Sequence, residues 1–396
     1  MSHKGSLEGI RVLDLGRVLS APFATAMLGD MGADVIKVEQ PDRGDDSRNF
    51  MPRKDDISAY FINFNRSKKG VTLDLKKGKD VFLEMAKHVD VVVENFRPGV
   101  MKRLGLDYEE LKKVNPKVIY AAISGFGQTG PYAQRAGYDT MAQAMGGIMS
   151  VTGWPGNPPT RSGASVADIM GGLQAVIGIL AALRYRDQTG RGQLVDISLA
   201  DCAVVGLSSV NQVYLTTGRV PERIGNSYES SAPGGGYRSK DGYFIMNGSA
   251  PKFWKILCNA LGNPELIDHP RFATNSLRVT NKVELDKIVE DWSTTMTTDE
   301  VIKLLLGLGF AAAPVLTIDK VVADPHIGGV REMFPEVDHP QVGKIKVTGQ
   351  ALKMSETNPE VRCSSPLLGE HNEDVYGNTF GFTEKQIEEF EKSGVI

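Results

Sequence analysis

The stretch SGASVADIMGG, residues 162–172, places one carboxylate, Asp168, among small and apolar residues. The chain stays apolar or small through residues 171–185, which is the pattern of a buried helix. An Asp ahead of such a helix often serves as an N-cap, its oxygen accepting a free backbone N–H. A reactive carboxylate would have the same local sequence, because the helix dipole favours negative charge at the N-terminus. Local sequence leaves both interpretations open.

Glycine-rich and basic segments are the other candidates for a site. The stretch GFGQTG (125–130) lacks the helix that a dinucleotide-binding turn requires after it, so we interpret it as a tightly turned loop beside a ligand. The glycine run at 234–236 suits either a linker between domains or a mobile flap over a site. The basic clusters NRSKKG (65–70) and FRPGVMKRLG (96–105) lie near predicted strand ends, where they could hold phosphates.

Short apolar runs alternate with segments of helical spacing along the first half of the chain. This alternation predicts an α/β unit with a parallel sheet, whose strands are buried on both faces. The predicted strands are 10–16, 34–39, 90–96, 117–127 and the start of 192–210, and the predicted helices are 22–33, 78–89, 108–114, 139–149 and 167–186.

A change of composition at residues 218–236 marks the best domain boundary. Beyond it, residues 236–249 have the pattern of a hairpin with a Lys-Asp-Gly turn, followed by amphipathic helices. These features predict a second, smaller α+β domain, and the C-terminal residues TEKQIEEFEKSG predict a final helix.

The composition excludes several classes of protein. The chain has 396 residues, of which 41% are hydrophobic and 23% charged, as in soluble proteins with room for two domains. A net charge of -3 gives no reason to expect nucleic acid as a partner. The three cysteines, Cys202, Cys258 and Cys363, are too scattered for a disulfide framework or a structural zinc site. With no signal-like start and no full membrane span, we expect a cytoplasmic protein with no membrane partner and no bound metal.

Several stretches, in this order along the chain, resemble the class III CoA-transferases, the family of formyl-CoA transferase and carnitine CoA-transferase. They run from LEGIRVLDLGRVLSAPFATAMLGDMGADVIKVEQPDRGDDSR through NFNRSKKGVTLDLK, VENFRPGVMKRLG, YAAISGFGQTGPY, RAGYD, SGASVADIMGG and TGRGQLVDISLAD to PLLGEH. The resemblance covers essentially the whole chain, and it is specific because many independent motifs keep their spacing. The N-terminal segment is most similar to the succinate–hydroxymethylglutarate CoA-transferase branch.

The resemblance implies that Asp168 is the catalytic residue of a CoA-transferase. A carboxylate can attack an acyl-CoA to give a mixed anhydride and a free thiolate, which can return to form an aspartyl-CoA thioester. Carried over by position, the CoA contacts fall on Val18, Leu73, Lys76, Asn95, Phe96, Arg103 and Tyr138. The remaining implied substrate or flap residues are Asp139, Gly234, Gly235 and Gly236.

The same resemblance implies the architecture and the substrates. We expect a Rossmann-like large domain built from residues 1–220 and 330–396, a small α+β domain at 225–325, and an interlocked homodimer. The expected substrates are an acyl-CoA, with succinyl-CoA as the leading donor, and a carboxylic acid, with no tightly bound cofactor. A second carboxylate on the acid would need a cation, for which Arg17 and Arg48 are candidates; both also suit ordinary surface or phosphate-facing positions, and a monocarboxylate stays open.

Two departures and three alternatives accompany the resemblance. The formyl-CoA branch has Gln where this chain has Leu19, and Arg where it has Gln40, for which Arg43 is a candidate substitute. Racemases of the same fold use a His in the context AGHD, whereas this chain has AGYD with Tyr138, a poor base at neutral pH. An acyl-CoA racemase is therefore the closest alternative, with a thioesterase and a non-catalytic CoA-binding subunit behind it.

Overall fold

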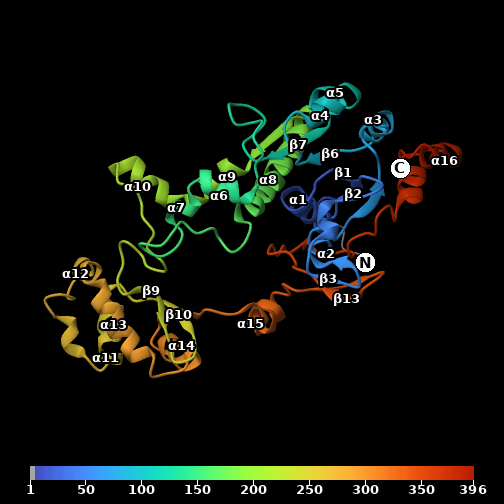
Figure 1. Cartoon of the computed structure of the whole chain (residues 1–396). Helices are drawn as coiled ribbons and strands as arrows, with labels where there is room; N and C mark the ends of the chain where they lie inside the picture. Colours follow the sequence, from blue (N-terminus) through green and yellow to red (C-terminus); the bar gives the residue numbers. More distant parts are fainter. Residues whose placement is uncertain (1–4) are drawn as a thin grey trace. The chain divides into compact units, whose positions relative to one another are not determined.

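The computed structural model of the protein describes residues 5–396 and divides into two compact units, which we describe separately (Figure 1). The large unit comprises residues 5–149, 161–219 and 325–396. The small unit comprises residues 220–324 together with residues 150–160, a segment that the sequence pattern did not assign to it.

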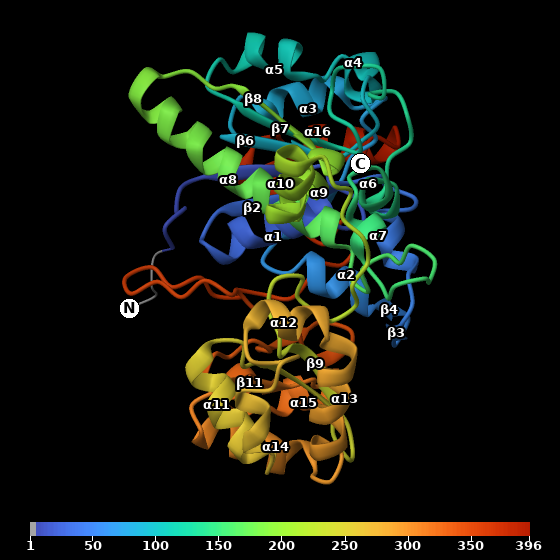
Figure 2. The same ribbon diagram turned by 90° about the vertical axis from the view of Figure 1, so that its left-hand side faces the viewer.

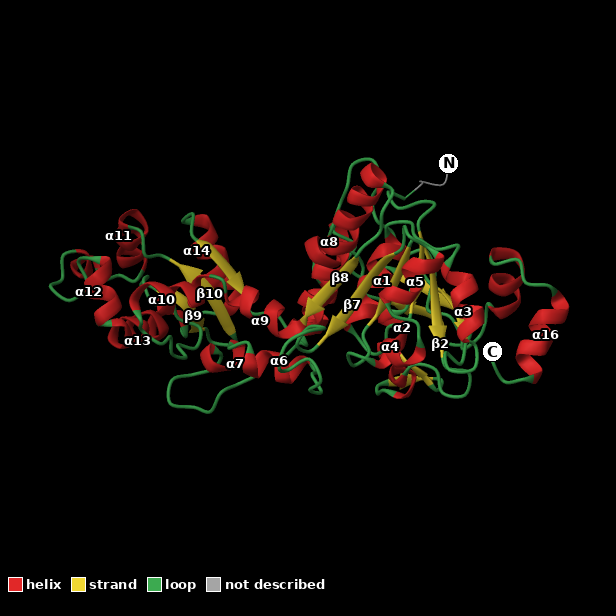
Figure 3. Ribbon diagram, turned by 90° about the horizontal axis from the view of Figure 1, so that it is seen from above, coloured by secondary structure: helices red, strands yellow, loops and turns green. Residues whose placement is uncertain are grey.

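A six-stranded parallel sheet forms the centre of the large unit (Figure 3), which confirms the predicted α/β fold with a parallel sheet. Numbered along the chain, the strands follow the order 3-2-1-4-5-6 of doubly wound folds, which bind ligands at the carboxyl ends of the strands where the order reverses. Here the reversal lies between β1 and β6. In spatial order the strands are β5 (Lys69–Thr72), β2 (Asp34–Glu39), β1 (Arg11–Asp14), β6 (Val91–Glu94), β7 (Ile119–Ser124) and β8 (Leu194–Ser198).

Helices cover both faces of this sheet because successive side chains of each strand point to opposite faces. Val91 and Val93 pack on one face with α1 (Ser20–Asp30) and α8 (Val166–Thr189), whereas Val92 packs on the other. The second face is covered by α3 (Lys79–Ala86), α4 (Val100–Leu104), α5 (Tyr108–Val114) and α16 (Glu384–Lys392).

The C-terminal segment belongs to the large unit, where it lies beside β5 and α3 (Figure 1). The buried Tyr376 hydroxyl donates to the carbonyl of Thr72 at 2.7 Å, and the Asn372 side chain bonds both the backbone N–H and the hydroxyl of Thr72. These contacts bring together residues that are 300 positions apart in the chain.

Two glycines let α8 approach its neighbours closely. A Cβ on Gly172 would lie 2.8 Å from the carbonyl oxygen of Ser20 in α1, and one on Gly171 would lie 2.5 Å from Leu199. The contact fixes the first turns of α8 against the carboxyl end of the sheet. By length and composition alone, α8 is apolar enough to span a membrane, and 44% of its most apolar window is buried within the unit.

The prediction that the basic cluster at residues 65–70 could hold phosphates is wrong. Lys69 begins the edge strand β5, and its side chain pairs with Asp374 at 3.0 Å. Lys68 is buried and pairs with Asp14 at 2.8 Å, while Arg66 is buried and pairs with Asp30 at 2.8 Å. Arg66 and Lys68 are neutralised inside the protein and Lys69 is paired near the surface, so the cluster has no unpaired cation for an anion.

The small unit contains a three-stranded antiparallel sheet packed with helices (Figure 2). The glycines Gly234, Gly235 and Gly236 are neither loop nor linker, because they open the edge strand β9 and pair with β10. A Cβ on Gly235 would lie 2.4 Å from the carbonyl oxygen of Asn226, which explains the need for glycine there. The elements are β9 (Gly234–Arg238), β10 (Tyr243–Asn247), β11 (Ala311–Pro314), α11 (Pro251–Ala260), α12 (Asn275–Thr280), α13 (Lys282–Ser293), α14 (Thr298–Gly307) and α15 (Ile318–Ala323).

The remaining elements of the large unit are short. Two two-stranded pairs lie outside the main sheet, β3 (Arg53–Lys54) with β4 (Ile57–Ser58) and β12 (Glu336–His339) with β13 (Gly343–Lys346). The helices are α2 (Ala59–Phe64), α6 (Asp139–Met145), α9 (Leu199–Leu207) and α10 (Ser209–Thr217), and α7 (Ile148–Val151) leads from the large unit into the small one.

Candidate active site

A cavity of about 670 Å³ opens at the carboxyl end of the sheet, where the strand order reverses. The segments that follow β1, β6 and β7 form its walls, together with the loop before α6 and the first turn of α8. Its lining includes Arg17, Val18, Leu19, Ser20, Asp46, Phe50, Asn95, Phe96, Arg97, Pro98, Ser124, Gly125, Arg135, Tyr138, Asp168 and Leu199.

Asp168 lies in the first turn of α8 but does not cap the helix, so the N-cap interpretation is wrong. The N-cap is Ser165, and its side chain makes no capping hydrogen bond. Instead, Asp139 at the start of α6 supplies the acceptor, since its Oδ1 receives the backbone N–H of Ala167 at 2.9 Å and of Asp168 at 3.3 Å. A carboxylate from another helix therefore satisfies the helix terminus and leaves the Asp168 side chain free.

Asp139 is itself held in place by neighbouring amide groups. Its Oδ2 accepts the Gln143 side-chain N–H at 2.6 Å, and the Gln143 oxygen accepts the backbone N–H of Ser162 at 2.9 Å. Asp139 and Gln143 are both buried. The network ties α6 to the segment before α8 and fixes the position of Asp168.

The Asp168 carboxylate is half-buried and accepts no hydrogen bond from residues 5–396. Burial, together with the negative charge of Asp139, raises the pKa of Asp168 to about 7. Near neutral pH, this side chain is an unpaired carboxylate that ionises within reach of a cavity large enough for a substrate. Such a group is suited to act as a nucleophile or a base.

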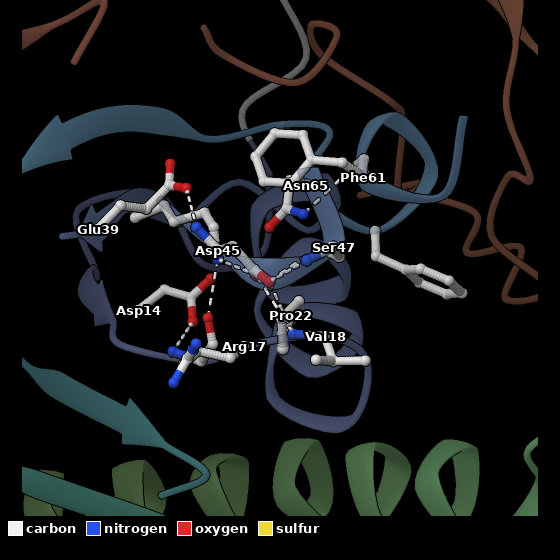
Figure 4. Close-up of polar contacts among 12 residues, drawn as sticks. Asp14, Arg17, Val18, Pro22, Glu39, Asp45, Ser47, Phe61 and Asn65 are labelled. Carbon is white, nitrogen blue, oxygen red and sulfur yellow. Dashed lines mark hydrogen bonds and ion pairs between the residues drawn. The ribbon is translucent and has the colours of Figure 1, made fainter. Parts of the chain in front are cut away.

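The turn after β1 forms one wall of the cavity and is held by polar contacts (Figure 4). The Asp45 carboxylate accepts the backbone N–H of Val18 at 3.1 Å, and Lys37 donates to Asp45 at 3.0 Å. From the β6 side, the Asn95 side chain bonds both the N–H and the carbonyl of Arg17, each at 2.8 Å. Asn95 thus joins the two loops at the point where the strand order reverses.

A smaller cavity of about 230 Å³ shares Arg17 and Phe96 with the larger one. Leu73 and Lys76 line it, and so does Gln40, whose side-chain oxygen accepts from Arg43 at 3.3 Å. Of the seven residues predicted to bind CoA, Val18, Asn95, Phe96 and Tyr138 line the larger cavity and Leu73, Lys76 and Phe96 line the smaller one.

Arg103 lines neither cavity and is exposed on α4, with its guanidinium near Gly99. Lys76 and Arg103 have no ion-pair partner within the described residues, so both remain available to an anion. Contact of these seven residues with CoA stays a prediction.

The two cations predicted for a second carboxylate differ. Arg17 lines both cavities, and its guanidinium lies 2.5 Å from Asp46 in a half-exposed pair. Arg48 is outside both cavities, makes two bonds to Glu39 at 2.7 and 2.8 Å, and lies 3.8 Å above the Phe61 ring. Its charge is already neutralised, so Arg48 is not available to a substrate.

Four further residues belong to this region, of which Arg97 alone lies in a segment that the sequence marked as a candidate phosphate site, the basic cluster 96–105. The Ser124 hydroxyl is buried without a partner among the described residues and ends strand β7 at the cavity. Arg97 and Arg135 line the cavity as exposed cations, and Arg135 lies 3.8 Å above the Tyr132 ring. Burial and then the charge of Asp168 raise the pKa of the Tyr60 hydroxyl, which keeps it protonated near the site. Arg97, Arg135 and Ser124 stand in the motifs FRPG, RAGYD and YAAISGFGQTGPY, whereas no motif pointed to Tyr60.

The remaining predicted site residues lie elsewhere. Gly234, Gly235 and Gly236 belong to the small unit, and their role as a cover over Asp168 stays a prediction. Within residues 5–396, no three His, Cys, Asp or Glu side chains gather into a group that could hold a metal ion.

Comparison with known proteins shows what the chain resembles as a whole. Residues 7–372 match the family described as CoA-transferase family III. The chain is 36% identical to a succinyl-CoA–D-citramalate CoA-transferase of Chloroflexus aurantiacus, over 98% of each chain. It is 38% identical to the human succinyl-CoA:glutarate CoA-transferase, over 100% of this chain and 91% of the human one. The crystal structure of a CAIB/BAIF family protein from Brucella suis superposes with a TM-score of 0.86 at 38% identity, over 95% of this chain and 99% of that one.

Proposed function

Since the chain belongs to CoA-transferase family III and is a CoA-transferase, we propose that Asp168 is its nucleophile and that CoA passes through covalent aspartyl intermediates. The observation that carries the proposal is the Asp168 carboxylate, left without a hydrogen-bond donor at the cavity while a second carboxylate, Asp139, caps its helix. A carboxylate without a donor keeps its lone pairs for the substrate.

In the first half-reaction, a carboxylate oxygen of Asp168 attacks the thioester carbonyl of the acyl-CoA. The C–S bond breaks, CoA leaves as the thiolate, and an acyl-aspartyl anhydride forms. The thiolate then attacks the aspartyl carbonyl, and the donor acid leaves as its carboxylate, which gives aspartyl-CoA. The acceptor carboxylate repeats these steps in reverse and restores the Asp168 carboxylate. One thioester is exchanged for another, so the balance needs no further reactant.

Two cavities that share the lining residues Arg17 and Phe96 suit the two ends of an acyl-CoA. We assign the smaller cavity, with Lys76 beside it, to the phosphate-bearing part of CoA, and the larger cavity to the thioester. Phe96 lines both and supplies apolar contact between them. The backbone N–H of Phe96 donates to the buried Glu94 at 2.6 Å, which fixes this residue between the cavities.

We propose succinyl-CoA as the donor and a dicarboxylic acid as the acceptor. Two of the relatives are named for succinyl-CoA and for citramalate or glutarate, which are dicarboxylic acids. In this chain, Arg17 is the cation for the second carboxylate, since it lines the cavity and only a half-exposed Asp46 competes for it. The assay is a panel of dicarboxylic and monocarboxylic acids with succinyl-CoA and acetyl-CoA; turnover of monocarboxylic acids alone would reject the assignment.

We also propose a homodimer with interlocked chains. The support from this chain is apolar surface on neighbouring helices of the large unit, of the kind that marks protein interfaces. It includes Leu173, Ile177 and Leu180 on α8, Val204 and Val205 on α9, and Tyr214 and Leu215 on α10. Light scattering is expected to give twice the mass of one chain at all dilutions that retain activity, whereas an active monomer would contradict the dimer.

Covalent trapping tests the role of Asp168. The enzyme is incubated with succinyl-CoA and hydroxylamine, digested, and analysed by mass spectrometry, and a hydroxamate is expected on Asp168 alone. Asp168→Asn is expected to remove both the adduct and the turnover. Asp187→Asn changes an exposed carboxylate at the other end of the same helix and serves as the matched control. Turnover by Asp168→Asn, or an adduct on another residue, would contradict the proposal.

A further inference from the structure

The turn after β1 contains one residue in an unfavourable backbone conformation. Val18 has φ +64°, in the left-handed region that a β-branched residue rarely occupies. Val18 lines the cavity that contains Asp168, and its neighbours Arg17, Leu19 and Ser20 line it as well. A strained residue persists only where the surrounding structure holds it, and such residues concentrate at functional sites.

One carboxylate holds the strained residue. Both oxygens of Asp45 lie within hydrogen-bond distance of the Val18 N–H, at 3.1 and 3.2 Å. Asp45 is 2% exposed, and it also accepts from the Ser47 N–H at 2.9 Å and the Ser47 hydroxyl at 2.8 Å. Figure 4 shows Asp45 at the centre, with Ser47 to its right, Arg17 and Val18 of the turn below it, and Glu39 to the upper left.

A buried lysine fixes Asp45 from the sheet. Lys37, in β2, is fully buried and donates to Asp45 at 3.0 Å and to the carbonyl of Gly16 at 2.8 Å. The backbone N–H of Asp45 donates to Glu39 at 2.8 Å. Lys37 therefore bonds both the carboxylate and the start of the turn, and it couples the turn to the strand beside β1.

We propose that Asp45 is a positioning residue that holds Val18 in its left-handed conformation and so keeps the cavity wall at 17–20 in the shape that binds the acyl-CoA. The proposal rests on the proposed function of this cavity. Without the carboxylate, a left-handed valine is disfavoured about 5- to 30-fold relative to ordinary conformations. Because apparent affinity falls with the binding-competent fraction, the KM for acyl-CoA rises by a similar factor.

The test removes the ion pair in two backgrounds, one with the native valine at position 18 and one with Val18→Gly. Replacing the pair with Asp45→Ala and Lys37→Met avoids leaving an unpaired buried charge. We expect this variant to raise the KM for succinyl-CoA about 5- to 30-fold with little change in kcat. Adding Val18→Gly is expected to abolish most of the rise relative to Val18→Gly alone, because glycine adopts the left-handed conformation freely. Asp45→Leu with Lys37→Met, which keeps the size of the side chain at position 45, provides a second variant if the first double replacement does not fold.

The matched control replaces the buried pair of Asp30 and Arg66 by Asp30→Ala and Arg66→Met. This control is expected to lower the melting temperature without changing the KM. An unchanged KM on loss of Asp45, an equal rise in the Val18→Gly background, or an equal rise in the control would each overturn the proposal. Asp168→Asn separates a failure of the proposed function from a failure of this inference. If Asp168→Asn stays active, the proposed function fails. If Asp168→Asn is inactive and loss of Asp45 leaves the KM unchanged, this inference alone fails.

Discussion

At the carboxyl end of the sheet, the carboxylates of Asp14 and Asp45 have surroundings opposite to those of Asp168. Asp14 and Asp45 are buried beside the two buried lysines Lys68 and Lys37, and each accepts several hydrogen bonds. Although burial opposes it, Lys37 and the backbone N–H groups of Ser47 and Val18 lower the pKa of Asp45 to about 2. Asp168 has no such partners, and burial with the charge of Asp139 raises its pKa to about 7.

The difference separates residues that fix shape from the residue that reacts. A paired carboxylate has its oxygens occupied and its charge neutralised, so it holds neighbouring backbone in place. An unpaired carboxylate near its pKa keeps free lone pairs but costs stability whenever it is ionised. The large unit places paired and unpaired carboxylates at the same carboxyl end of the sheet. The predictions below test whether paired carboxylates fix shape and the unpaired one reacts, from the largest expected effect to the smallest.

The largest expected effect concerns Asp168. Asp168→Asn removes the nucleophile while keeping the shape of the side chain, and we expect kcat to fall at least ~1,000-fold. The same variant should be more stable than the wild type at pH 8, by about 1–2 kcal/mol after allowance for partial exposure, because it removes an ionised carboxylate without partners. Steady-state kinetics and urea unfolding measure the two effects. Loss of activity together with loss of stability would indicate a structural role instead.

Removal of a paired carboxylate should have the opposite result. Asp14→Ala leaves Lys68 buried without its counter-charge, and we expect a loss of about 3–5 kcal/mol in the free energy of unfolding. Glu388→Ala, which breaks the exposed pair with Lys392, should cost less than about 0.5 kcal/mol. Urea unfolding of both variants provides the measurement. Equal losses in the free energy of unfolding would show that the buried pair of Asp14 and Lys68 contributes no more to stability than the exposed pair does.

The pH dependence of turnover should follow Asp168. Its pKa of about 7 means that kcat/KM for acyl-CoA rises with pH and levels off above 7, with about a tenfold fall per unit well below it. Asp139→Asn removes the like charge and should move this profile to lower pH. A profile that is flat between pH 5 and 8 would show that Asp168 titrates outside this range.

Ionisation of Asp168 and ionisation of Asp45 change the free energy of unfolding in opposite directions. The folded-state pKa of Asp168 is raised, so its ionisation destabilises the folded protein as pH rises from about 4 to 7. The folded-state pKa of Asp45 is lowered, so its contribution is present above about pH 4 and is lost as pH falls through 2. Unfolding of Asp168→Asn as a function of pH should lack the first change and retain the second.

The smallest effect distinguishes two buried serines. The Ser47 hydroxyl donates to Asp45 at 2.8 Å, so Ser47→Ala should cost about 1–2 kcal/mol in the free energy of unfolding. The Ser124 hydroxyl has no partner among residues 5–396, so Ser124→Ala should leave stability unchanged or slightly higher. Thermal unfolding of the two variants checks the pair, and a loss for Ser124→Ala as large as that for Ser47→Ala would reveal a partner for this hydroxyl.

Much of the large unit could be predicted from the sequence because the spacing of apolar residues reflects which face of each strand or helix is buried. Runs such as RVLD and DVIKVE became β1 and β2, and the apolar stretch after Asp168 became α8. The strand at Lys69–Thr72 was missed, because the basic residues of this segment indicated a phosphate site near a strand end, whereas Lys68 and Lys69 pair with carboxylates of distant segments. The glycine run at 234–236 suggested a linker or a flap, whereas it pairs with β10 as part of β9, and the close approach of Gly235 to the carbonyl of Asn226 requires glycine there.

The sequence by itself determined the α/β alternation, the apolar helix behind Asp168 and the motifs that resemble one family. Only the tertiary structure decided which groups surround Asp168. Its backbone N–H donates to Asp139, and its carboxylate has no donor among residues 5–396. The acceptor for its helix terminus comes from Asp139, 29 positions earlier, and the carboxylate that holds Val18 comes from Asp45, 27 positions later. The physical reason is that periodicity depends on each residue's own burial, whereas the charge state and freedom of a carboxylate depend on groups that the fold brings to it from other segments.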